Sequence, residues 1–277
     1  MANLGELIAS VSHRFSEAGI ASSEVDAELL IAHHLGVSRG ELQAMALTGR
    51  QIELTPELQH DIQRRADRFP LQHITGTAPF RNFELVVGPG VFIPRPETES
   101  VVDIALAKLA GIESPKVLDI GTGSGAIAVA VALESNAEVI AVEASDEAAA
   151  FAKTNVGMLA PGVSLLVGDF RDLNLGFEIY DLVVSNPPYI PLSAVPVDPE
   201  VRDHDPDLAL YGGEDGLDLI RELIETAWYL LKPGGSLVLE HADGQSDAVC
   251  ELLLAKWHQV SAHQDATGRY RAVSAVR

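Results

Sequence analysis

Apolar residues recur at helical spacing through the first 70 positions of the chain. Two sets, within residues 4–15 and 25–33, would each fall on one face of a helix. Glycines that can end such helices follow at Gly19, Gly36 and Gly49. Polar residues that can cap the helix N-termini are Asn3, Ser22 or Ser23, Ser38 and Thr55. The pattern predicts a small all-helical unit.

The pattern changes to short-range alternation between residues 69 and 99. Apolar and polar side chains alternate around Gly88-Pro89-Gly90, which favours a β-hairpin that turns at this tripeptide. The stretch ends in Ile93-Pro94-Arg95-Pro96-Glu97, where prolines stiffen the backbone on both sides of Arg95. We expect a hairpin linker, with Arg95 and Glu97 either as surface charges on a rigid connection or as contacts near a binding site.

Strand and helix patterns alternate after a helix expected over residues 98–110. The strand candidates are Lys116–Ile120, Val139–Glu143, Ser164–Val167, Leu182–Ser185 and Ser236–Glu240. Two late segments, 258–263 and 269–276, can close the sheet as an antiparallel hairpin. This alternation predicts an α/β domain with a mostly parallel seven-stranded sheet and helices on both faces. Ligands of such sheets bind beyond the carboxyl ends of the strands.

These patterns divide the 277-residue chain into a helical unit (1–72), a hairpin linker (73–97) and an α/β domain (98–277). A hydrophobic share of 47% is enough for a normal core. No apolar run reaches the roughly 18 residues of a membrane span, and the N-terminus has no leader pattern. We therefore expect a cytoplasmic protein that binds no membrane. We also expect a monomer.

Acidic residues outnumber basic residues by 40 to 19, which gives a formal net charge of -21. This charge repels phosphate at long range and no basic patch offsets it, so direct binding to nucleic acid is not expected. Cys250 is the single cysteine, which excludes an internal disulfide and a cysteine-cluster metal site. His204, His241 and His263 lack ligand spacing, and we expect no metal.

A glycine-rich turn, Gly121-Thr122-Gly123-Ser124-Gly125, follows the first strand of the α/β domain. Its glycines allow a tight turn and a close approach of the backbone to a ligand. Glu143 ends the next strand about 20 residues later, where a carboxylate can bind a ribose diol. Two ligands fit this pattern: a dinucleotide, whose third glycine would fall at Ile127, and S-adenosylmethionine. Asp119 favours the second, because a carboxylate is unfavourable beside phosphates.

Two further strand ends supply chemistry to the same edge of the sheet. Asp169 can accept a hydrogen bond from an adenine amine, and the ring of Phe170 can pack on the base. The fourth strand ends in Asn186-Pro187-Pro188-Tyr189, where the prolines hold Asn186 extended. The Asn186 amide, the Pro187 carbonyl and the Tyr189 ring form a mould for a planar group that carries an NH2. A carboxamide or the exocyclic amine of a base would fit.

The chain resembles the release factor glutamine methyltransferases (the HemK/PrmC family) of the class I S-adenosylmethionine-dependent methyltransferases. The Asn-Pro-Pro-Tyr element is shared with adenine and some rRNA methyltransferases, so other segments discriminate better. These are the residues Phe92–Glu99, the segment Asp207–Leu217 and the pair Glu240-His241. The resemblance covers nearly the whole chain. It implies a Rossmann-like class I methyltransferase domain preceded by a small helical domain that recognises the substrate.

The resemblance also implies an activity: methyl transfer from S-adenosylmethionine to N5 of the glutamine in the Gly-Gly-Gln motif of peptide chain release factors, with S-adenosylhomocysteine as product. The implied cofactor residues are Gly121, Thr122, Gly123, Ser124, Gly125, Glu143, Asp169, Phe170 and Asn186. The implied substrate residues are Asn186, Pro187, Pro188 and Tyr189, of which Asn186, Pro187 and Tyr189 are catalytic. Phe170 stands where the family often has tryptophan, Glu143 replaces the commoner aspartate, and Ala242 replaces a glycine.

Two other functions stay open from the residues alone. An adenine-N6 or other nucleic-acid amino methyltransferase would present a flipped base to the same mould, but it predicts a basic surface and steep salt dependence. A non-catalytic cofactor-binding module would leave the Asn-Pro-Pro-Tyr placement unexplained. His241 is an alternative general base. The run 190–218 is long for a loop, and we expect it to form a mobile lid over the substrate.

Overall fold

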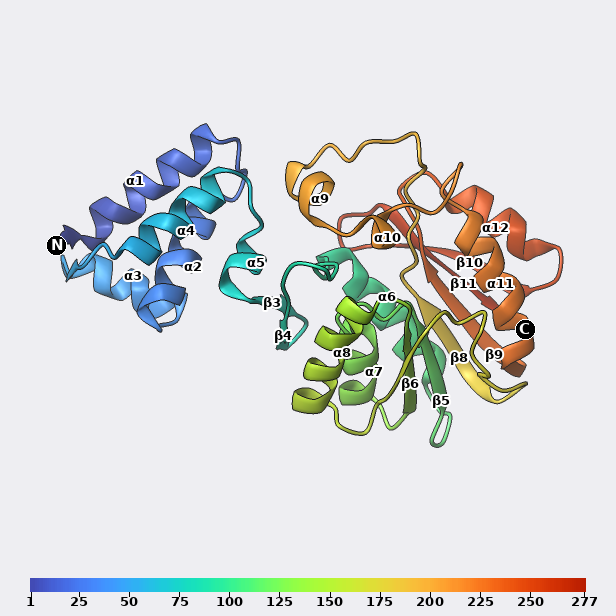
Figure 1. The fold of residues 1–277 in the computed structure, drawn as a ribbon. Helices are drawn as coiled ribbons and strands as arrows, with labels where there is room; N and C mark the ends of the chain where they lie inside the picture. The colour runs from blue at the N-terminus through green and yellow to red at the C-terminus, as the bar shows by residue number, and fades with distance from the viewer. The chain divides into compact units, whose positions relative to one another are not determined.

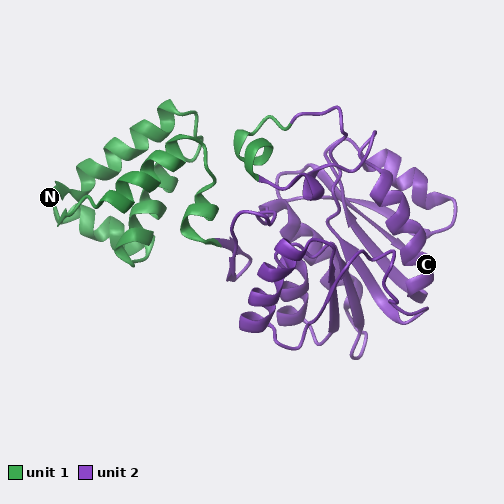
Figure 2. Cartoon of the chain, viewed as in Figure 1, with its two compact units in different colours: residues 1–77, 196–204 green, residues 78–195, 205–277 purple.

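The structure is a computed structural model that describes residues 1–277. The chain forms two compact units, each described by itself below (Figure 2). Unit 1 comprises residues 1–77 and 196–204, and unit 2 comprises residues 78–195 and 205–277. No helix combines the length and the apolar composition needed to cross a membrane.

Unit 1 is a helical bundle with a two-stranded ribbon. Its first seven elements are β1 (Ala2–Asn3), α1 (Leu4–Glu17), α2 (Ser23–Leu35), α3 (Arg39–Leu47), β2 (Gln51–Ile52), α4 (Pro56–Ala66) and α5 (Leu71–Thr75). The apolar faces expected from the sequence meet in one core, in which Leu4, Phe15, Leu30 and Leu42 are fully buried. The all-helical prediction is confirmed, apart from the short β1–β2 ribbon.

The predicted caps explain where these helices begin. Asn3 accepts hydrogen bonds from the backbone N–H groups of the first turn of α1, and Thr55 accepts one from Leu58 N. Ser38 and Glu41 form a complete capping box at α3. Ser22 precedes α2 but makes no backbone cap, because its hydroxyl donates to Asp26 Oδ1 at 2.8 Å instead.

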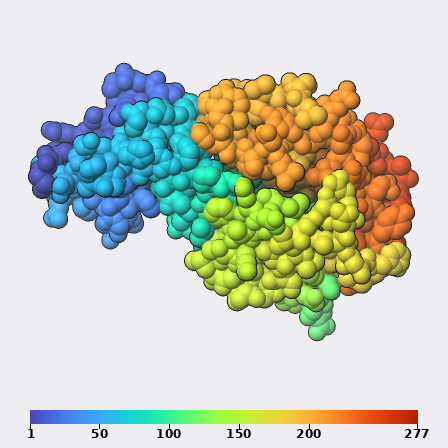
Figure 3. All heavy atoms as spheres, viewed as in Figure 1, coloured from blue at the N-terminus to red at the C-terminus, as the bar shows by residue number.

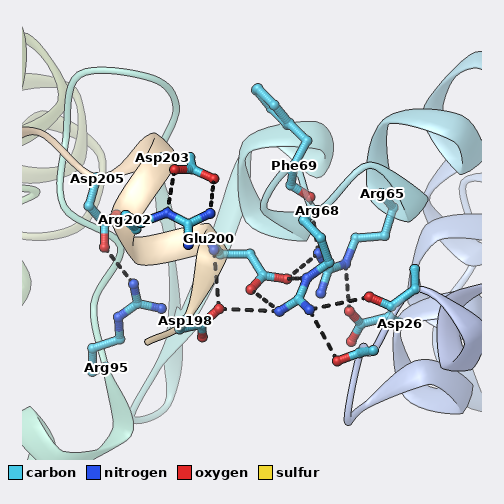
Figure 4. A network of polar contacts seen from close by, with 12 residues as sticks. Asp26, Arg65, Arg68, Phe69, Arg95, Asp198, Glu200, Arg202, Asp203 and Asp205 are labelled. Atoms are coloured by element: carbon cyan, nitrogen blue, oxygen red, sulfur yellow. Dashed lines mark hydrogen bonds and ion pairs between the residues drawn. The ribbon is translucent and has the colours of Figure 1, made fainter. Parts of the chain in front are cut away.

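A helix far along the chain, α9 (Pro199–His204), belongs to unit 1. The Glu200 carboxylate accepts hydrogen bonds from Arg65 Nη1 at 2.7 Å and from Arg68 Nε at 2.8 Å (Figure 4). Arg65 also donates to Asp26 at 2.8 Å, so the buried guanidinium joins two carboxylates. These arginines hold the pKa of Glu200 well below its usual range, against the effect of burial. Residues 196–204 thus belong to the charged end of unit 1. The sequence analysis had assigned these residues to the α/β domain.

The hairpin predicted between residues 73 and 97 exists, but its turn lies elsewhere. Strands β3 (Thr77–Phe80) and β4 (Phe83–Val86) turn at Arg81-Asn82, not at Gly88-Pro89-Gly90. Arg81 adopts φ 50°, an unusual value for this residue type. Its guanidinium is held by Asp103 at 2.8 Å and by Glu134 at 2.5 Å, and these ion pairs stabilise the turn.

Unit 2 contains a seven-stranded sheet in the order β10-β11-β9-β8-β5-β6-β7 (Figure 1). The strands are β5 (Lys116–Ile120), β6 (Glu138–Glu143), β7 (Ser164–Val167), β8 (Tyr180–Ser185), β9 (Leu231–Glu240), β10 (His258–Gln264) and β11 (Tyr270–Val276). β5 to β9 run parallel, and β11 pairs antiparallel with both β9 and β10, so β11 is the reversed strand of the sheet. The predicted mixed sheet with a closing hairpin is confirmed.

Helices cover both faces of this sheet. The helices of unit 2 are α6 (Pro96–Leu109), α7 (Ala126–Glu134), α8 (Asp146–Leu159), α10 (Asp207–Leu210), α11 (Asp218–Leu230) and α12 (Ser246–Leu254). α6, α7 and α8 share one core with side chains such as Leu182 and Val184, while α11 and α12 share another with Val183. Successive strand residues therefore face opposite cores, as expected for a central sheet that is buried on both sides.

The order of the strands places two strand ends side by side. β5 lies between β6 and β8, so the chain order reverses at the β5–β8 boundary. A crevice forms at such a reversal beyond the carboxyl ends of the strands. The Ser185 hydroxyl at the end of β8 donates to the Ile120 carbonyl at the end of β5, over 2.6 Å. The glycine turn and the Asn-Pro-Pro-Tyr element therefore leave the sheet as neighbours.

Candidate active site

The glycine turn after β5 adopts backbone conformations that require glycine. Gly121, Gly123 and Gly125 have φ values of 72°, 58° and 87°. A side chain at Gly121 or Gly123 would begin in open space, with no neighbouring atom within 4 Å. The turn thus leaves room for a ligand to approach its backbone.

A buried acid, Asp119, holds this turn from behind. Its Oδ2 accepts hydrogen bonds from the Thr122 hydroxyl at 2.6 Å and from Ala128 N at 3.1 Å. Burial raises the pKa of Asp119 to about 7. The Thr122 side chain is buried against Asp119, and Ser124 is also buried, so this turn presents backbone rather than side chains to a ligand. Asp119 shapes the site, although the sequence alone had suggested only that it disfavours phosphate.

Glu143 at the end of β6 stands beside the same turn. Its Oε2 accepts from Gly123 N at 2.7 Å, and its Oε1 accepts from Ser145 N at 2.9 Å. Each carboxylate oxygen has more than one lone-pair site, so both can accept a further hydrogen bond. The carboxylate is therefore fixed in place and still able to bind a diol.

A cavity of about 290 Å³ lies beyond the strand ends. Among the residues that the sequence analysis proposed, those lining it are Gly121, Glu143, Asp169, Phe170, Pro187 and Pro188. Those that do not line it are Thr122, Gly123, Ser124, Gly125, Asn186 and Tyr189. The cavity therefore unites contributions from four strand ends, while the Asn186 and Tyr189 side chains lie outside its wall.

Asp169 and Phe170 follow β7 and line the cavity together. Asp169 Oδ1 accepts hydrogen bonds from Arg171 N at 3.0 Å and Arg171 Nε at 2.8 Å. The Arg171 guanidinium lowers the pKa of Asp169, so this carboxylate stays ionised. The Phe170 ring is buried in the core of unit 2 and also lines the cavity. This pair offers one acceptor and one apolar surface to a ligand.

The opposite wall of the cavity comes from residues that sequence reasoning did not identify as site residues. They are Leu208, Tyr211, Gly212, Gly213 and the first turns of α11. Ile190 pairs with Tyr211, and Gly212 N donates to Ile190 O at 2.9 Å. The only signal for this wall was the segment Asp207–Leu217, which carried the family resemblance without a stated role.

Glycines let this wall pack directly on the Asn-Pro-Pro-Tyr backbone. A side chain at Gly212 would overlap the carbonyl oxygen of Pro188, and one at Gly216 would overlap that of Tyr189. Gln245 completes the support, because its Nε2 donates to the Tyr189 carbonyl at 3.0 Å.

The run 190–218, predicted to form a mobile lid, contains short stretches of regular secondary structure. It contains α9 and α10, and part of it belongs to unit 1. Residues near position 200, amber in Figure 3, lie on the surface of the molecule, where Leu192, Val195 and Val197 are exposed. Arg95 Nη2 binds the fully buried carboxylate of Asp205 at 2.6 Å, which fixes the return of this run into unit 2 (Figure 4).

Asn186 stands at the end of β8 with its amide oriented. Its Nδ2 donates to the Thr98 hydroxyl oxygen at 3.2 Å, so Oδ1 is left to accept from another group. The Tyr189 hydroxyl donates to Glu240 Oε1 at 3.4 Å. Burial raises the pKa of Tyr189, which therefore keeps its proton. Thr98 and Glu240 lie in segments that carried the family resemblance, but sequence reasoning gave neither of them a site role, because no local pattern brings α6 and β9 to this strand end.

His241 follows Glu240 and is fully buried. Its Nδ1 lies 2.8 Å from the Ala242 carbonyl, and burial lowers the pKa of the imidazole. Its Nε2 makes no ordinary hydrogen bond, and the backbone of Ala272 is the second group that interacts with the ring. Because the ring is closed off from solvent, the structure does not support the alternative that His241 is the general base. Ala242 has no positive φ, so the family glycine that it replaces is not needed here.

Together, a doubly wound sheet, a glycine turn after β5, an acid after β6 and an Asn-Pro-Pro-Tyr end on β8 define a class I methyltransferase. Comparisons with known proteins agree. One family model, the PrmC N-terminal domain, matches residues 6–76, and a second, a methyltransferase domain, matches residues 113–273. The chain belongs to the release factor glutamine methyltransferase family.

The relatives cover both units of the chain. The release factor glutamine methyltransferase of Streptomyces coelicolor is 46% identical, over 97% of this chain and 96% of its own length. That of Mycolicibacterium smegmatis is 42% identical over 100% of this chain and 99% of its own length. Among solved structures, a methyltransferase from Pyrococcus furiosus shares the fold with a TM-score of 0.52 and 20% identity, over 69% of this chain and 87% of that chain.

The residues of the cavity fit S-adenosylmethionine, the cofactor of this class. The open space at Gly121 and Gly123 suits close approach of an amino-acid tail. S-adenosylmethionine has no phosphate, so it places no second negative group beside the buried Asp119, as a dinucleotide would. Glu143 offers free lone pairs to a ribose diol, and Asp169 offers a carboxylate to an adenine amine. The dinucleotide alternative is thereby disfavoured.

Proposed function

We propose that this protein transfers a methyl group from S-adenosylmethionine to the side-chain amide nitrogen (N5) of the glutamine in the Gly-Gly-Gln motif of peptide chain release factors. The names and full-length similarity of its relatives support this substrate. The observation that carries the proposal is the orientation of Asn186: Nδ2 is engaged by Thr98, and Oδ1 is free to accept from a substrate NH2.

The cofactor would be held by the residues that line the cavity. Glu143 would accept from the ribose hydroxyls, Asp169 would accept from the adenine amine, and Phe170 would border the base. The backbone of residues 121–125 would hold the methionine part. When bound, S-adenosylmethionine supplies an electrophilic methyl group on a positively charged sulfur.

Asn186 and Pro187 would position the substrate nitrogen. A carboxamide nitrogen is a poor nucleophile, because its lone pair is delocalised into the carbonyl, as the rotation barrier of roughly 18–20 kcal/mol in a peptide bond shows. If its two hydrogens are donated to Asn186 Oδ1 and the Pro187 carbonyl, its rotation is restricted. Both acceptors stabilise positive charge that develops on nitrogen, by about 1.5–3 kcal/mol for each charge-assisted bond. Correct geometry of approach can contribute about 7–11 kcal/mol more.

The prolines and Tyr189 would keep this arrangement rigid and dry. Pro187 and Pro188 fix their own φ angles, so the acceptors need little reorganisation during the reaction. The Tyr189 ring is packed against the core of unit 2, and its carbonyl is held by Gln245. We infer that Tyr189 forms a wall of the substrate site and limits the entry of water.

A nucleic-acid amino methyltransferase is the second candidate, since a flipped base presents the same NH2 group. The formal net charge of -21 opposes it, because such enzymes depend on basic surfaces to neutralise phosphates. No observation in the structure favours this candidate over a protein substrate.

The deciding experiment is incubation with methyl-labelled S-adenosylmethionine and one of three substrates: a release factor, the same factor with the Gly-Gly-Gln glutamine changed to glutamate, or DNA. Peptide mapping should place the label on that glutamine of the first substrate alone. Label on DNA, or equal labelling of both protein substrates, would overturn the proposal.

A further inference from the structure

Two buried polar side chains, next to Asn186 and Tyr189, have no direct part in the proposed methyl transfer. Thr98 lies in the first turn of α6 with 4% of its surface exposed, and Glu240 ends β9 with 1% exposed. The Thr98 hydroxyl has two polar neighbours, the Asn186 amide and the Glu240 carboxyl group. Burying a polar group costs folding free energy unless it is hydrogen-bonded, so the presence of these buried groups needs an explanation.

The donor and acceptor properties of Asn186, Thr98 and Glu240 determine in which direction the hydrogen bonds of this cluster run. An asparagine amide can face a hydroxyl with either its NH2 or its oxygen, because a hydroxyl both donates and accepts. An ionised carboxylate only accepts. If the Thr98 hydrogen points to Glu240, then the Thr98 oxygen must accept from Asn186, and only the Nδ2 side of the amide satisfies it. Oδ1 then faces outward.

We propose that Glu240, acting through the Thr98 hydroxyl, orients the Asn186 amide so that its oxygen accepts from the substrate nitrogen, and that the same carboxylate anchors Tyr189. Glu240 and Thr98 are positioning residues, which touch neither substrate nor cofactor. Tyr189 donates to Glu240 Oε1 at 3.4 Å, and Oε2 is buried without an ordinary hydrogen bond. The Thr98 hydroxyl is near enough to this carboxyl group to lower its pKa. The inference rests on the proposed function, because it concerns the substrate side of that site.

The charged groups around Glu240 act in opposite directions. Burial raises the pKa of Glu240 to about 7; Glu97 also raises it, whereas the Thr98 and Tyr189 hydroxyls and Arg271 lower it. The adjacent His241 has a pKa lowered by burial and adds no positive charge near neutral pH. The carboxylate form, which the orientation requires, is therefore gained as pH rises through about 7.

The test compares four single variants with wild type in release factor methylation. Glu240→Gln keeps the shape but adds a donor, and Thr98→Val keeps the shape but removes the hydroxyl. Each should lower kcat by about tenfold or more while the Kd for S-adenosylmethionine stays within about threefold. Thr98→Ser restores the hydroxyl and should recover most of the loss. Thr154→Val, on the exposed face of α8, is the matched control and should act as wild type.

A double variant, Thr98→Val with Glu240→Gln, separates a relay from two independent effects. If Glu240 acts through Thr98, the double variant should lose little more kcat than Thr98→Val alone. The dependence of wild-type kcat on a group with pKa near 7 should also disappear in Thr98→Val.

Three results would overturn the relay while leaving the proposed function intact: an active wild type with unchanged kcat in Thr98→Val, a fully additive double variant, or no recovery in Thr98→Ser at unchanged melting temperature. A wild type that fails to label the release factor would instead sink the proposed function.

Discussion

The two strand ends that form the site each rest on a fully buried acid, and they use it differently. Burial raises the pKa of both Asp119, behind the glycine turn, and Glu240, behind the Asn-Pro-Pro-Tyr element, to about 7. Asp119 accepts from a backbone N–H and from Thr122, and it thereby shapes a loop. Glu240 faces two side-chain hydroxyls, those of Tyr189 and Thr98, and it thereby directs side chains.

Glycines show the same contrast. A side chain at Gly121 would begin in open space, whereas a side chain at Gly212 or Gly216 would overlap the carbonyls of the Asn-Pro-Pro-Tyr element. On the cofactor side, glycine leaves room for a ligand. On the substrate side, it leaves room for the protein's own backbone. We therefore expect changes at the first end to affect cofactor affinity, and changes at the second to affect turnover.

The largest expected effect is that of Asn186→Ala. Losing an oriented acceptor at the reacting nitrogen should lower kcat by about 10²–10³-fold, as loss of a preorganised transition-state contact does in other enzymes. Asn186 does not line the cavity, so the Kd for S-adenosylmethionine should change by no more than a few-fold. Single-turnover methylation and calorimetric titration would measure the two quantities. An equal loss of both would mean that Asn186 mainly serves the cofactor.

The second prediction concerns the packing of the substrate end. Gly216→Ala places a Cβ against the Tyr189 carbonyl at φ 79°, and the overlap and the strain together should cost about 2–5 kcal/mol of unfolding free energy. Gly121→Ala meets only the strain of its positive φ, so it should cost about 1–2 kcal/mol.

Chemical denaturation measures both losses. Gly157→Ala, at an exposed position within α8 with no neighbour within 4 Å, is the matched control and should be neutral or slightly stabilising. Equal stability of Gly216→Ala and the control would contradict the packing argument.

The strands and the cofactor end were readable from the sequence because their signals are local. Apolar runs predicted β5 and β7 with the bounds that the structure has, and helix caps such as Ser38 and Thr55 act within one turn. The glycine turn and Glu143 are likewise set by two adjacent parallel strands. Each of these inferences needs only a few neighbouring residues.

The substrate end was harder, because its contacts join distant segments. Thr98, Asn186 and Glu240 come from α6, β8 and β9, and nothing in a local pattern shows that they meet. The hairpin turn was misplaced for the same reason: Arg81 is held at a positive φ by two distant carboxylates, while Gly88-Pro89-Gly90 had the stronger local signal. The position of the turn is therefore associated with ion pairs between distant segments, which a local sequence pattern does not reveal.

Glu143→Gln tests the cofactor end of the comparison. An amide has only one acceptor oxygen, so it cannot accept from Gly123 N and Ser145 N and also bind a diol with both atoms. The Kd for S-adenosylmethionine should rise by about tenfold or more, while kcat at saturating cofactor stays close to wild type. Glu138→Gln, on an exposed position of the same strand, controls for the lost charge. A fall in kcat without a change in Kd would contradict the assignment of cofactor affinity to the glycine-turn end and of turnover to the Asn-Pro-Pro-Tyr end.

The smallest expected effect is a pH dependence of stability that both acids share. A carboxyl group whose pKa is raised on folding binds its proton more tightly in the folded state. Its contribution is fully present below the unfolded pKa and is lost as pH rises through about 7. Asp169 and Asp215 have lowered pKa values, so their contributions are lost only at more acidic pH.

Each of the two acids should therefore lower stability by at most about 1.4 kcal/mol per pH unit as pH rises from about 5 to about 7. His241 and His263, whose pKa values burial lowers, act in the opposite direction over the same range. Asp119→Asn keeps an oxygen that can accept from Thr122 and Ala128 but does not titrate, so the melting temperature should fall less with rising pH than in wild type, by the share of one acid. Asp172→Asn, at an exposed position, should keep the full slope. If Asp119→Asn also keeps the full slope, then Asp119 does not titrate in this range. Asp119 and Glu240 would then share their burial but not a raised pKa.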